Sequence, residues 1–185
     1  MSTPLIILII FAIIIVLIYN SLVAKKNQVE NIFASVDTQL KKRYDLIPNL
    51  VASVSEYMEH EKSTLEEITK LRAEANKPNT SDAKKMQLDT KISAALGSIM
   101  IAVENYPELK ANENVMHLQR SLNEVEEQIS AARRAYNQAV TDYNNALEQI
   151  PSNIMATLMH YTKKDVFEIA QTERKNIDVN ELFER

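Results

Sequence analysis

The feature that most constrains this chain is a long apolar run that leads with almost no break into a heptad-patterned helix. Every residue from Pro4 to Tyr19 is apolar, and no charged side chain appears before Lys25. Continued to Ala24, the stretch holds about 20 residues, which at about 1.5 Å per residue crosses the roughly 30 Å hydrocarbon core of a bilayer. We therefore predict a transmembrane anchor over residues 4–24, with the rest of the chain tied to a bilayer surface.

A cleaved signal peptide is the alternative interpretation of the same run. Such a peptide has basic residues before a shorter apolar core, and small residues at the cleavage site. Here no Lys or Arg precedes the run, and the exit reads Ser21-Leu22-Val23-Ala24, with a bulky Leu two residues before a cut after Ala24. The pattern favours a retained anchor.

Basic residues close to the span predict its orientation. Only the α-amine precedes the run, whereas five basic residues lie within about 20 residues after it, namely Lys25, Lys26, Lys41, Lys42 and Arg43. The positive-inside rule then puts the N-terminus outside and the body in the cytoplasm. Lys25 and Lys26 also suit anionic headgroups, which attract each nearby Lys by about 1 kcal/mol.

The composition of the body favours helix throughout and excludes several classes of function. The chain has one glycine, no tryptophan and no cysteine. Without cysteine there is no disulfide, thiolate nucleophile or cysteine-based metal site. The net charge of −4 lies entirely outside the apolar run. That charge argues against nucleic acid as a partner, because binding to nucleic acid requires a basic face.

Apolar residues recur at alternating steps of three and four, a spacing typical of helices in bundles and coiled coils. Four helices are predicted, over about 25–76, 81–105, 108–149 and 152–173, with a loosely ordered tail over 175–185. Prolines mark the joints, at Pro78, Pro107 and Pro151. Short joints make neighbouring helices antiparallel. The predicted fold is thus all-α: an anchor helix followed by an elongated up-down four-helix bundle over 25–174.

Pro48 lies inside the first predicted helix and not at a joint. The apolar positions keep their phase on both sides of it, from Leu40 through Ile47 to Val54. A kink within one helix preserves that phase better than a loop does. We predict a kinked helix.

Several charged residues occupy positions where the heptad pattern calls for apolar ones. Buried charges are costly unless they are paired and hydrogen-bonded. One hypothesis is that these side chains pair between helices and set their register. The alternative is that they lie at the rim, since an ideal helix drifts relative to the heptad. They are Arg43, Glu61 and Arg72 in the first helix, and Glu126 and Arg133 in the third, flanked by Tyr136-Asn137 and Tyr143-Asn144.

Templates for catalysis and metal binding fit poorly. A di-iron site in a bundle needs Glu-x-x-His motifs, and none of His60, His117 and His160 has a Glu three residues before it. The acidic cluster around His60, with Glu56, Glu59 and Glu61, is more typical of a solvated helix face. One glycine cannot form a phosphate-binding loop. The sequence therefore predicts no enzyme, no metal and no cofactor.

Three segments together resemble the LemA family of bacterial membrane proteins. The strings are QLKKRYDLIPNLV, which includes Arg43, Asp45, Pro48 and Asn49, then YPELKAN from Tyr106, then ARRAYN continuing to Tyr143-Asn144. Ile150-Pro151 at the start of the last predicted helix also matches, and the likeness covers nearly the whole chain. One departure is Met159-His160-Tyr161, where the family pattern has a pair similar to Gly-Phe; it puts the local packing of the last helix in doubt.

The resemblance implies a single-pass protein of the bacterial inner membrane with an antiparallel helical bundle. It implies no established catalytic residues. Some relatives are associated with organising intracellular membrane compartments, and others are encoded near membrane proteases, which points to quality control. Whether Asp45, Pro48 and Asn49 serve to kink a helix or to make a contact stays open.

Two functions fit these observations. The first is a membrane-anchored scaffold that forms homo-oligomers, because anchoring in one plane raises the effective concentration of weak lateral contacts. The second is a binding or signalling adaptor, which would be favoured by a concave pocket near Arg43 or Arg133. The expected partners are the lipid bilayer, further copies of the chain and other membrane proteins.

Overall fold

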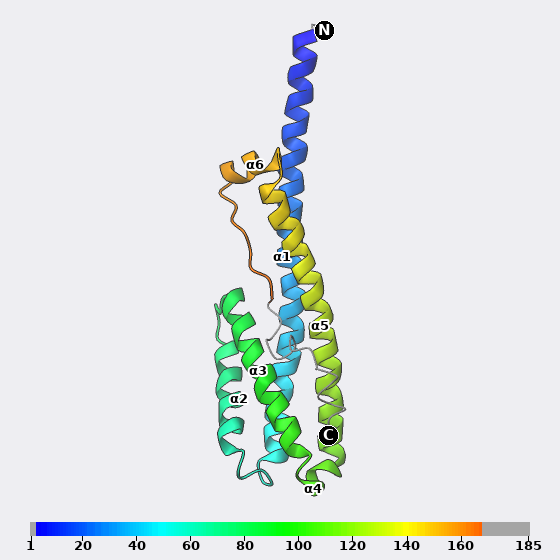
Figure 1. The fold of residues 1–185 in the computed structure, drawn as a ribbon, viewed down its shortest axis with the longest axis vertical. Coiled ribbons are helices and arrows are strands. Elements are labelled where there is room, and N and C mark those ends of the chain that lie inside the picture. The colour runs from blue at the N-terminus through cyan, green and yellow to red at the C-terminus, as the bar shows by residue number, and fades with distance from the viewer. Residues whose placement is uncertain (1–2, 168–185) are drawn as a thin grey trace, which may run out of the picture.

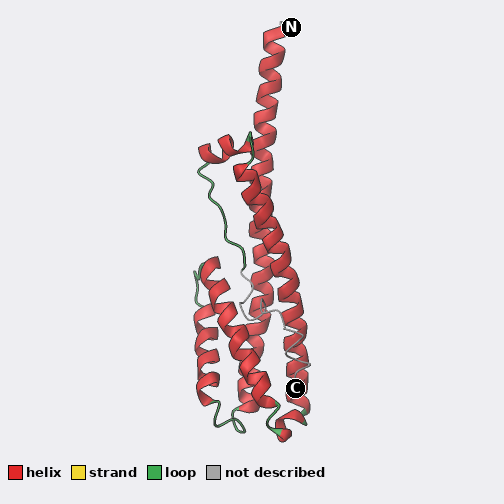
Figure 2. Ribbon diagram, in the orientation of Figure 1, coloured by secondary structure: helices red, strands yellow, loops and turns green. Residues whose placement is uncertain are grey.

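The computed structural model describes residues 3–167, and in this range the chain is all-helical (Figure 1, Figure 2). Two long helices run along most of the molecule, and shorter helices pack beside them. The helices are α1 (Thr3–Val54), α2 (Lys62–Ala75), α3 (Asp82–Val103), α4 (Pro107–Lys110), α5 (Glu113–Glu148) and α6 (Ser152–Leu158).

The first part of α1 stands free of the rest of the molecule. Large apolar side chains from Leu5 to Leu17 are exposed along it, and the helix projects well beyond its neighbours (Figure 1). Of the helices that the structure describes, α1 alone is long and apolar enough to cross a bilayer. Exposed Ile, Leu and Val on an isolated helix suit lipid as the surrounding solvent.

The half of the molecule far from the free end of α1, here called the distal half, contains four long segments side by side. The end of α1 and the start of α5 pack with α2 and α3, and α4 makes the turn from α3 to α5 (Figure 1). Apolar side chains from these helices are almost fully buried, and they include Leu40, Ile47, Leu50, Ile68, Ile92, Ile99 and Ile129. This is the main core of the protein.

The proximal half, nearer the free end of α1, is thinner. There α1 and α5 form an antiparallel pair, and α6 lies across them (Figure 1). Leu22, Ala146 and Ala156 form a small separate cluster at this point, with Ile18 partly buried against it. After α6 the chain turns back and runs along the rod without helix over residues 161–167, here called the extended segment.

The single kinked helix predicted over 25–76 is wrong. The helix continues through Pro48 to Val54, reverses over residues 55–61 and resumes as α2 at Lys62. The apolar periodicity did not reveal this reversal, because the end of α1 and α2 both direct their apolar residues into one core. The turn between them also contains an apolar residue, Met58, which is fully buried. The turn contains no glycine or proline that would have marked it.

The helix predicted over 152–173 is also wrong, because α6 ends at Leu158. His160 has φ of 53°, and the N–H of Tyr161 donates to the carbonyl of Ala156 at 3.0 Å. Such a bond across a left-handed residue is a common way to end a helix, and glycine is the usual residue there. Residues 168–173 and the predicted loose tail over 175–185 lie outside the described residues. The other two predicted helices, 81–105 and 108–149, lie close to α3 and α5.

Candidate functional site

Four charged side chains from three helices meet in the distal half, here called the ion-pair network. Arg43 of α1 contacts both Asp89 of α3 and Glu126 of α5, and Arg133 of α5 contacts Asp89 as well. Arg133 Nη1 lies 3.9 Å from Glu126 Oε1. Arg43 Nη1 also donates a hydrogen bond to Ser93 Oγ at 2.9 Å. The network thus ties α1, α3 and α5 together.

The inner pair of this network is inaccessible to solvent. The side chains of Arg43 and Asp89 are each 1% exposed, whereas those of Arg133 and Glu126 are 24% and 43% exposed. Burial lowers the pKa of the Arg43 guanidinium, and the charge of Glu126 opposes that shift. Two cations and two anions balance, so neither buried charge is left unpaired. The prediction of ion pairs between helices is thus confirmed for Arg43, Glu126 and Arg133, and their role in setting helix register stays a prediction.

Asp89 is the member of the network that sequence reasoning missed. Stepping back along α3 from Val103 by four, three, four and three residues leads through Ile99, Leu96 and Ile92 to Asp89. The heptad pattern therefore placed a carboxylate in the core. The neighbouring Leu88 is also buried, so the apolar face of α3 widens at this point.

Arg72 explains how α1 continues through Pro48. In an α-helix the N–H of residue 48 would donate to the carbonyl of Tyr44, but proline has no N–H. Arg72 Nε of α2 donates to that carbonyl at 2.7 Å. The guanidinium thus replaces the missing backbone donor, and the same bond holds α2 against α1. Pro48 and Arg72 form one structural unit, separate from the ion-pair network.

The remaining predicted residues of the first motif lie elsewhere. Glu61 accepts a hydrogen bond from the hydroxyl of Tyr106 at 2.9 Å, which connects the α1–α2 turn to the start of α4. Asp45, Pro48 and Asn49 are exposed on α1, and Asp45 pairs with Lys41 at 3.2 Å. Lys25 and Lys26 lie on α1 just past the apolar run. None of these residues reaches the ion-pair network.

Two asparagines of α5 hold the extended segment by its backbone. Asn144 accepts from the N–H of Lys164 at 3.0 Å and donates to the carbonyl of the same residue at 2.9 Å. Asn137 does the same with Phe167, at 2.8 Å and 3.0 Å. Each amide thus pairs with a peptide backbone much as a neighbouring strand would. Two turns of helix separate the two asparagines.

Aromatic rings fix the end of the extended segment beside the ion-pair network. Phe167 packs against Phe33 and Tyr136, with ring centroids 6.4 Å and 5.3 Å apart. The guanidinium of Arg133 lies 5.6 Å from the Phe167 ring. The Tyr136 hydroxyl donates to the carbonyl of Asp165 at 3.2 Å. Burial, helped by the charges of Asp82 and Asp165, raises the pKa of Tyr136 to about 12.

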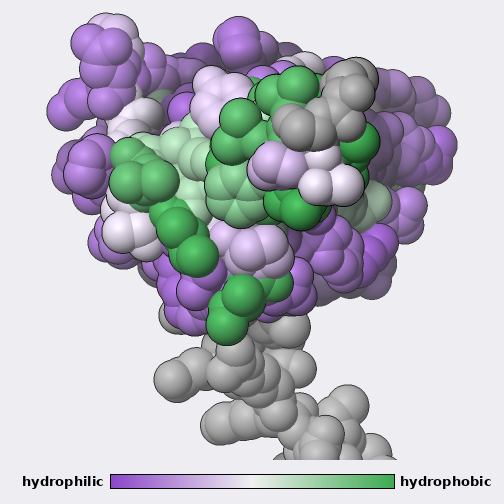
Figure 3. Space-filling view, turned by 90° about the horizontal axis from the view of Figure 1, so that it is seen from above, coloured by the Kyte–Doolittle hydropathy of each residue, from purple (hydrophilic) through white to green (hydrophobic). Residues whose placement is uncertain are grey.

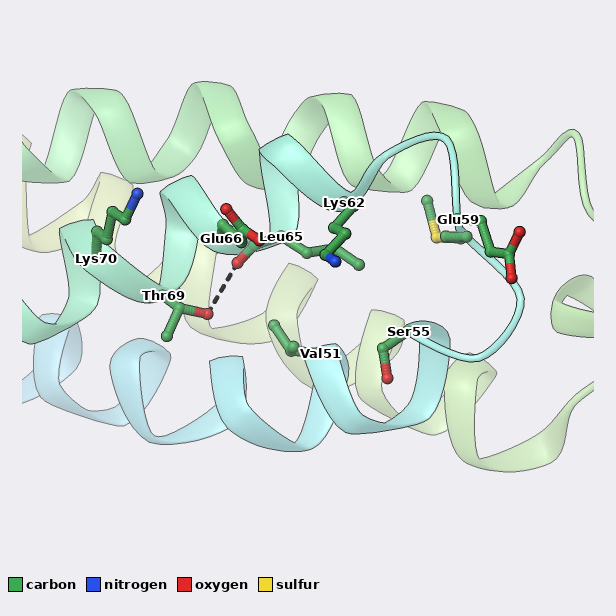
Figure 4. Close-up of a pocket in the computed structure, with 9 residues that line it drawn as sticks. Val51, Ser55, Glu59, Lys62, Leu65, Glu66, Thr69 and Lys70 are labelled. Atoms are coloured by element: carbon green, nitrogen blue, oxygen red, sulfur yellow. Dashed lines mark hydrogen bonds between the residues drawn. The ribbon is translucent and has the colours of Figure 1, made fainter.

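Two concavities are open to solvent. One, of about 760 Å³, lies between the end of α1 and α2 (Figure 4). Its polar wall alternates in charge through Glu59, Lys62, Glu66 and Lys70, and the hydroxyl of Thr69 is bonded to the Leu65 carbonyl at 2.8 Å. The other, of about 690 Å³, is lined by residues of α5 alone, namely Asn123, Glu126, Glu127, Ser130 and Arg134. Among residues 3–167, no three His, Asp or Glu side chains are grouped to hold a metal ion.

Comparison with known proteins identifies the family. The sequence model of the LemA family matches residues 32–180. The chain belongs to the LemA family. The matched region includes every member of the ion-pair network and both asparagines that hold the extended segment, so these contacts lie in the part of the chain that is typical of LemA proteins.

Individual relatives place this LemA chain near two kinds of protein. Protein LemA of Metamycoplasma hominis is 24% identical over 163 residues, which cover 88% of this chain and 74% of the relative. Magnetosome proteins MamQ 1 and MamQ 2 of Paramagnetospirillum magneticum are each 30% identical over 90 residues. That match covers 49% of this chain and 33% of each MamQ protein. None of these names is that of an enzyme.

Proposed function

We propose that this LemA protein is a membrane-anchored, non-enzymatic scaffold that self-assembles and organises membrane or membrane-protein partners. Its body lies on the cytoplasmic side of the bacterial inner membrane, as the basic residues after the span indicate. The relatives named LemA and MamQ support a membrane-associated, non-catalytic role.

The observation that carries this proposal is the continuity of α1. One helix of 52 residues runs from the exposed apolar stretch to the far end of the body, a length of about 78 Å at about 1.5 Å per residue. No linker separates anchor from body, so the body is held in a defined orientation to the bilayer. Copies confined to one plane with a common orientation meet at high effective concentration, so weak side-to-side contacts suffice for assembly.

The use of the polar side chains also supports a structural role. The buried charges pair with one another, Arg72 completes the α1 helix, and the asparagines hold the chain's own backbone. These groups are already engaged, and they stabilise a rod. The body also exposes a few large apolar side chains, among them Ile101, Tyr57 and Met116, which are available for weak lateral contacts between copies.

The test is the mass of the full-length protein in mild detergent, together with the number of copies per spot when it is labelled and reconstituted sparsely in vesicles. A discrete oligomer in both settings supports the scaffold. A monomer at every density in vesicles and every concentration in detergent would overturn it. Lys substitution of Ile101, which is 73% exposed on α3, with Asn145→Lys at an exposed position of α5 as the control, tests whether that face takes part.

The adaptor function has one observation in its favour, the concavity between α1 and α2. Its apolar floor, from Val51, Met58 and Leu65, lies beneath a charged rim, as in sites that hold a partner's side chain. A photo-crosslinker in place of Thr69 distinguishes the two functions. Adducts with a second copy of this chain fit the scaffold, whereas reproducible adducts with one other membrane protein fit the adaptor.

A further inference from the structure

The short helix α6 presents an apolar face that the described part of the chain does not cover. Ile150, just before the helix, is 83% exposed, and Ile154 and Leu158 are 62% and 70% exposed. Within α6, Ile154 and Leu158 are four residues apart, so they lie on one side of the helix, and Ile150 precedes it at the joint with α5. Large aliphatic side chains this exposed and this close together are unusual on a surface in water.

The opposite face of α6 is firmly packed, which fixes the direction of the exposed one. Ala156 is buried against Leu22 of α1 and Ala146 of α5, and Met155 and Met159 pack around this contact. The helix therefore cannot roll to hide Ile154 and Leu158 without losing that cluster. Its exposed face belongs to the native arrangement.

The packing against α1 places α6 at the edge of the predicted membrane span. Ile18 is partly buried and Leu22 fully buried beneath α6 and α5, although both lie within the span of 4–24. The stretch free for lipid, about 4–19, measures about 24 Å, which is shorter than the roughly 30 Å hydrocarbon core. A bilayer that surrounds the free part of α1 thus extends to the level of α6.

The view from the free end of α1 shows the same arrangement. Apolar side chains extend from the tip of α1 toward the side on which α6 lies, within a rim of hydrophilic side chains (Figure 3). The face that would touch a membrane is therefore broader than one helix.

Residues suited to the headgroup layer surround this height of the molecule. Tyr19 is exposed on α1, and Lys26 lies 5.4 Å from the ring of Tyr161. Lys25 follows the apolar run directly on α1, and Lys163 and Lys164 follow α6 in the extended segment. Tyrosines and lysines are enriched at the membrane–water boundary, and an interfacial helix buries its apolar face about 5–10 Å into it.

We propose that α6 is an interfacial helix, which inserts Ile150, Ile154 and Leu158 among the headgroups and upper acyl chains beside the anchor. The protein then contacts the bilayer twice, through a spanning helix and through a helix lying in the surface. The second contact adds a constraint on the depth and rotation of the rod to the orientation that the continuous anchor helix already gives it. This inference depends on the proposed membrane anchor and is independent of self-assembly.

The absence of tryptophan from the chain makes the test direct. Single-tryptophan variants Ile154→Trp and Leu158→Trp of the full-length protein are reconstituted in vesicles, with or without lipids brominated just below the headgroups. The tryptophans at positions 154 and 158 should fluoresce at short wavelength, and the brominated lipids should quench most of that fluorescence. Ile101→Trp, at a comparably exposed site on α3, should emit as in water and be unaffected. Phe11→Trp, at the middle of the apolar run, is the positive control for insertion, and its quenching is measured with lipids brominated near the ends of the acyl chains.

The possible results distinguish failure of the interfacial-helix proposal from failure of the scaffold proposal. If Phe11→Trp is quenched but the α6 tryptophans emit as in water, α6 is not in the interface and the proposal is overturned. Short-wavelength emission without bromine quenching overturns it too, because a second copy or another protein then covers this face. Quenched α6 tryptophans on a monomer would retain this inference and remove the scaffold. An unquenched Phe11→Trp would remove the anchor and with it both proposals.

Discussion

The distal and proximal halves of the rod are held together by different interactions. In the distal half, four segments surround a core of Leu and Ile, and the ion-pair network and the Arg72 bond lie within it. In the proximal half, two helices pair, and the third partner is an extended segment bound through backbone hydrogen bonds from Asn137 and Asn144. Apolar packing dominates one half, and specific polar bonds supplement it in the other.

The difference follows from how much apolar surface each half can bury. Four helices enclose a core that excludes water, and buried apolar area stabilises it by about 25 cal/mol per Å². In the proximal half, α1 and α5 leave one side of their interface exposed, and the extended segment covers that side. The distal half should therefore be the more stable of the two, and the proximal half should open first.

The largest effect is expected from removing the buried carboxylate of the network. Asp89→Ala leaves Arg43 buried with one partner in place of two, and breaking a buried pair typically costs about 3–5 kcal/mol. The free energy of unfolding, followed by the helical signal in urea, should fall by that order. The distal half should lose its stability as a unit, because three helices share the network.

A double replacement separates lost pairing from lost packing. Arg43→Met with Asp89→Leu removes both buried charges and keeps side chains of similar volume, so it should be much less destabilising than Asp89→Ala. Equal losses in the two variants would show that the carboxylate matters for its shape or for Arg133, and not for the buried pair.

The next effect concerns the proximal half. Asn137→Ala removes the two side-chain hydrogen bonds to the backbone of Phe167. Each lost bond should lower the free energy of unfolding by about 0.5–1.5 kcal/mol. The amide of Phe167 should exchange its hydrogen faster, while amides of α2 and α3 should not change. Asn145→Ala, at an exposed position of the same helix, is the matched control. Faster exchange throughout α2 and α3 would show that the halves are not independent.

Periodicity was the part of the sequence that predicted the fold well. The apolar run and the heptad steps indicated an all-helical protein with a long apolar helix at its start, and they located α3 and α5 to within a few residues. The steps could not distinguish one long helix from two helices facing the same core, so the reversal at 55–61 was missed. Direction reversal is a tertiary property that helix phase does not encode.

The polar contacts were harder to predict for a different reason. Arg43, Glu126 and Arg133 stood out because charges in an apolar stripe are conspicuous, but their common partner Asp89 did not. Asn137 and Asn144 were noticed as a repeat, and their role depends on an extended segment that no helical pattern could reveal. The His160 position carried the clue, since a glycine-like site there predicts that the helix ends.

A smaller effect is expected from the bond that compensates for Pro48. Arg72→Met leaves the Tyr44 carbonyl without its donor and should cost about 1 kcal/mol. Pro48→Ala restores a backbone N–H that can donate to the same carbonyl, so Arg72→Met should cost less in that background. The measurement is a double-mutant cycle of urea unfolding. Additive effects would show that Arg72 acts through packing alone.

An effect of similar size is a pH dependence that belongs to the boundary between the halves. The pKa of Tyr136 is about 12 in the folded protein against an ordinary 10.0. The folded state therefore holds this proton more tightly than the unfolded state, so stability is complete below about pH 10 and falls as the pH rises toward 12. Tyr136→Phe keeps the ring between Phe33 and Phe167 and removes the titration, so the fall should become shallower.

Burial also raises the pKa of Tyr44 in the distal half and of Tyr143 in the proximal half, so some of the fall should remain in Tyr136→Phe. Parallel unfolding measurements at pH 9 and pH 11 in both proteins give the difference directly. An unchanged slope would mean that the hydroxyl reaches solvent in the folded state. The hydrogen bond from the Tyr136 hydroxyl to the Asp165 carbonyl would then break well before the distal half unfolds. The proximal half, which depends on such hydrogen bonds, would thus be less stable than the half that depends on apolar packing.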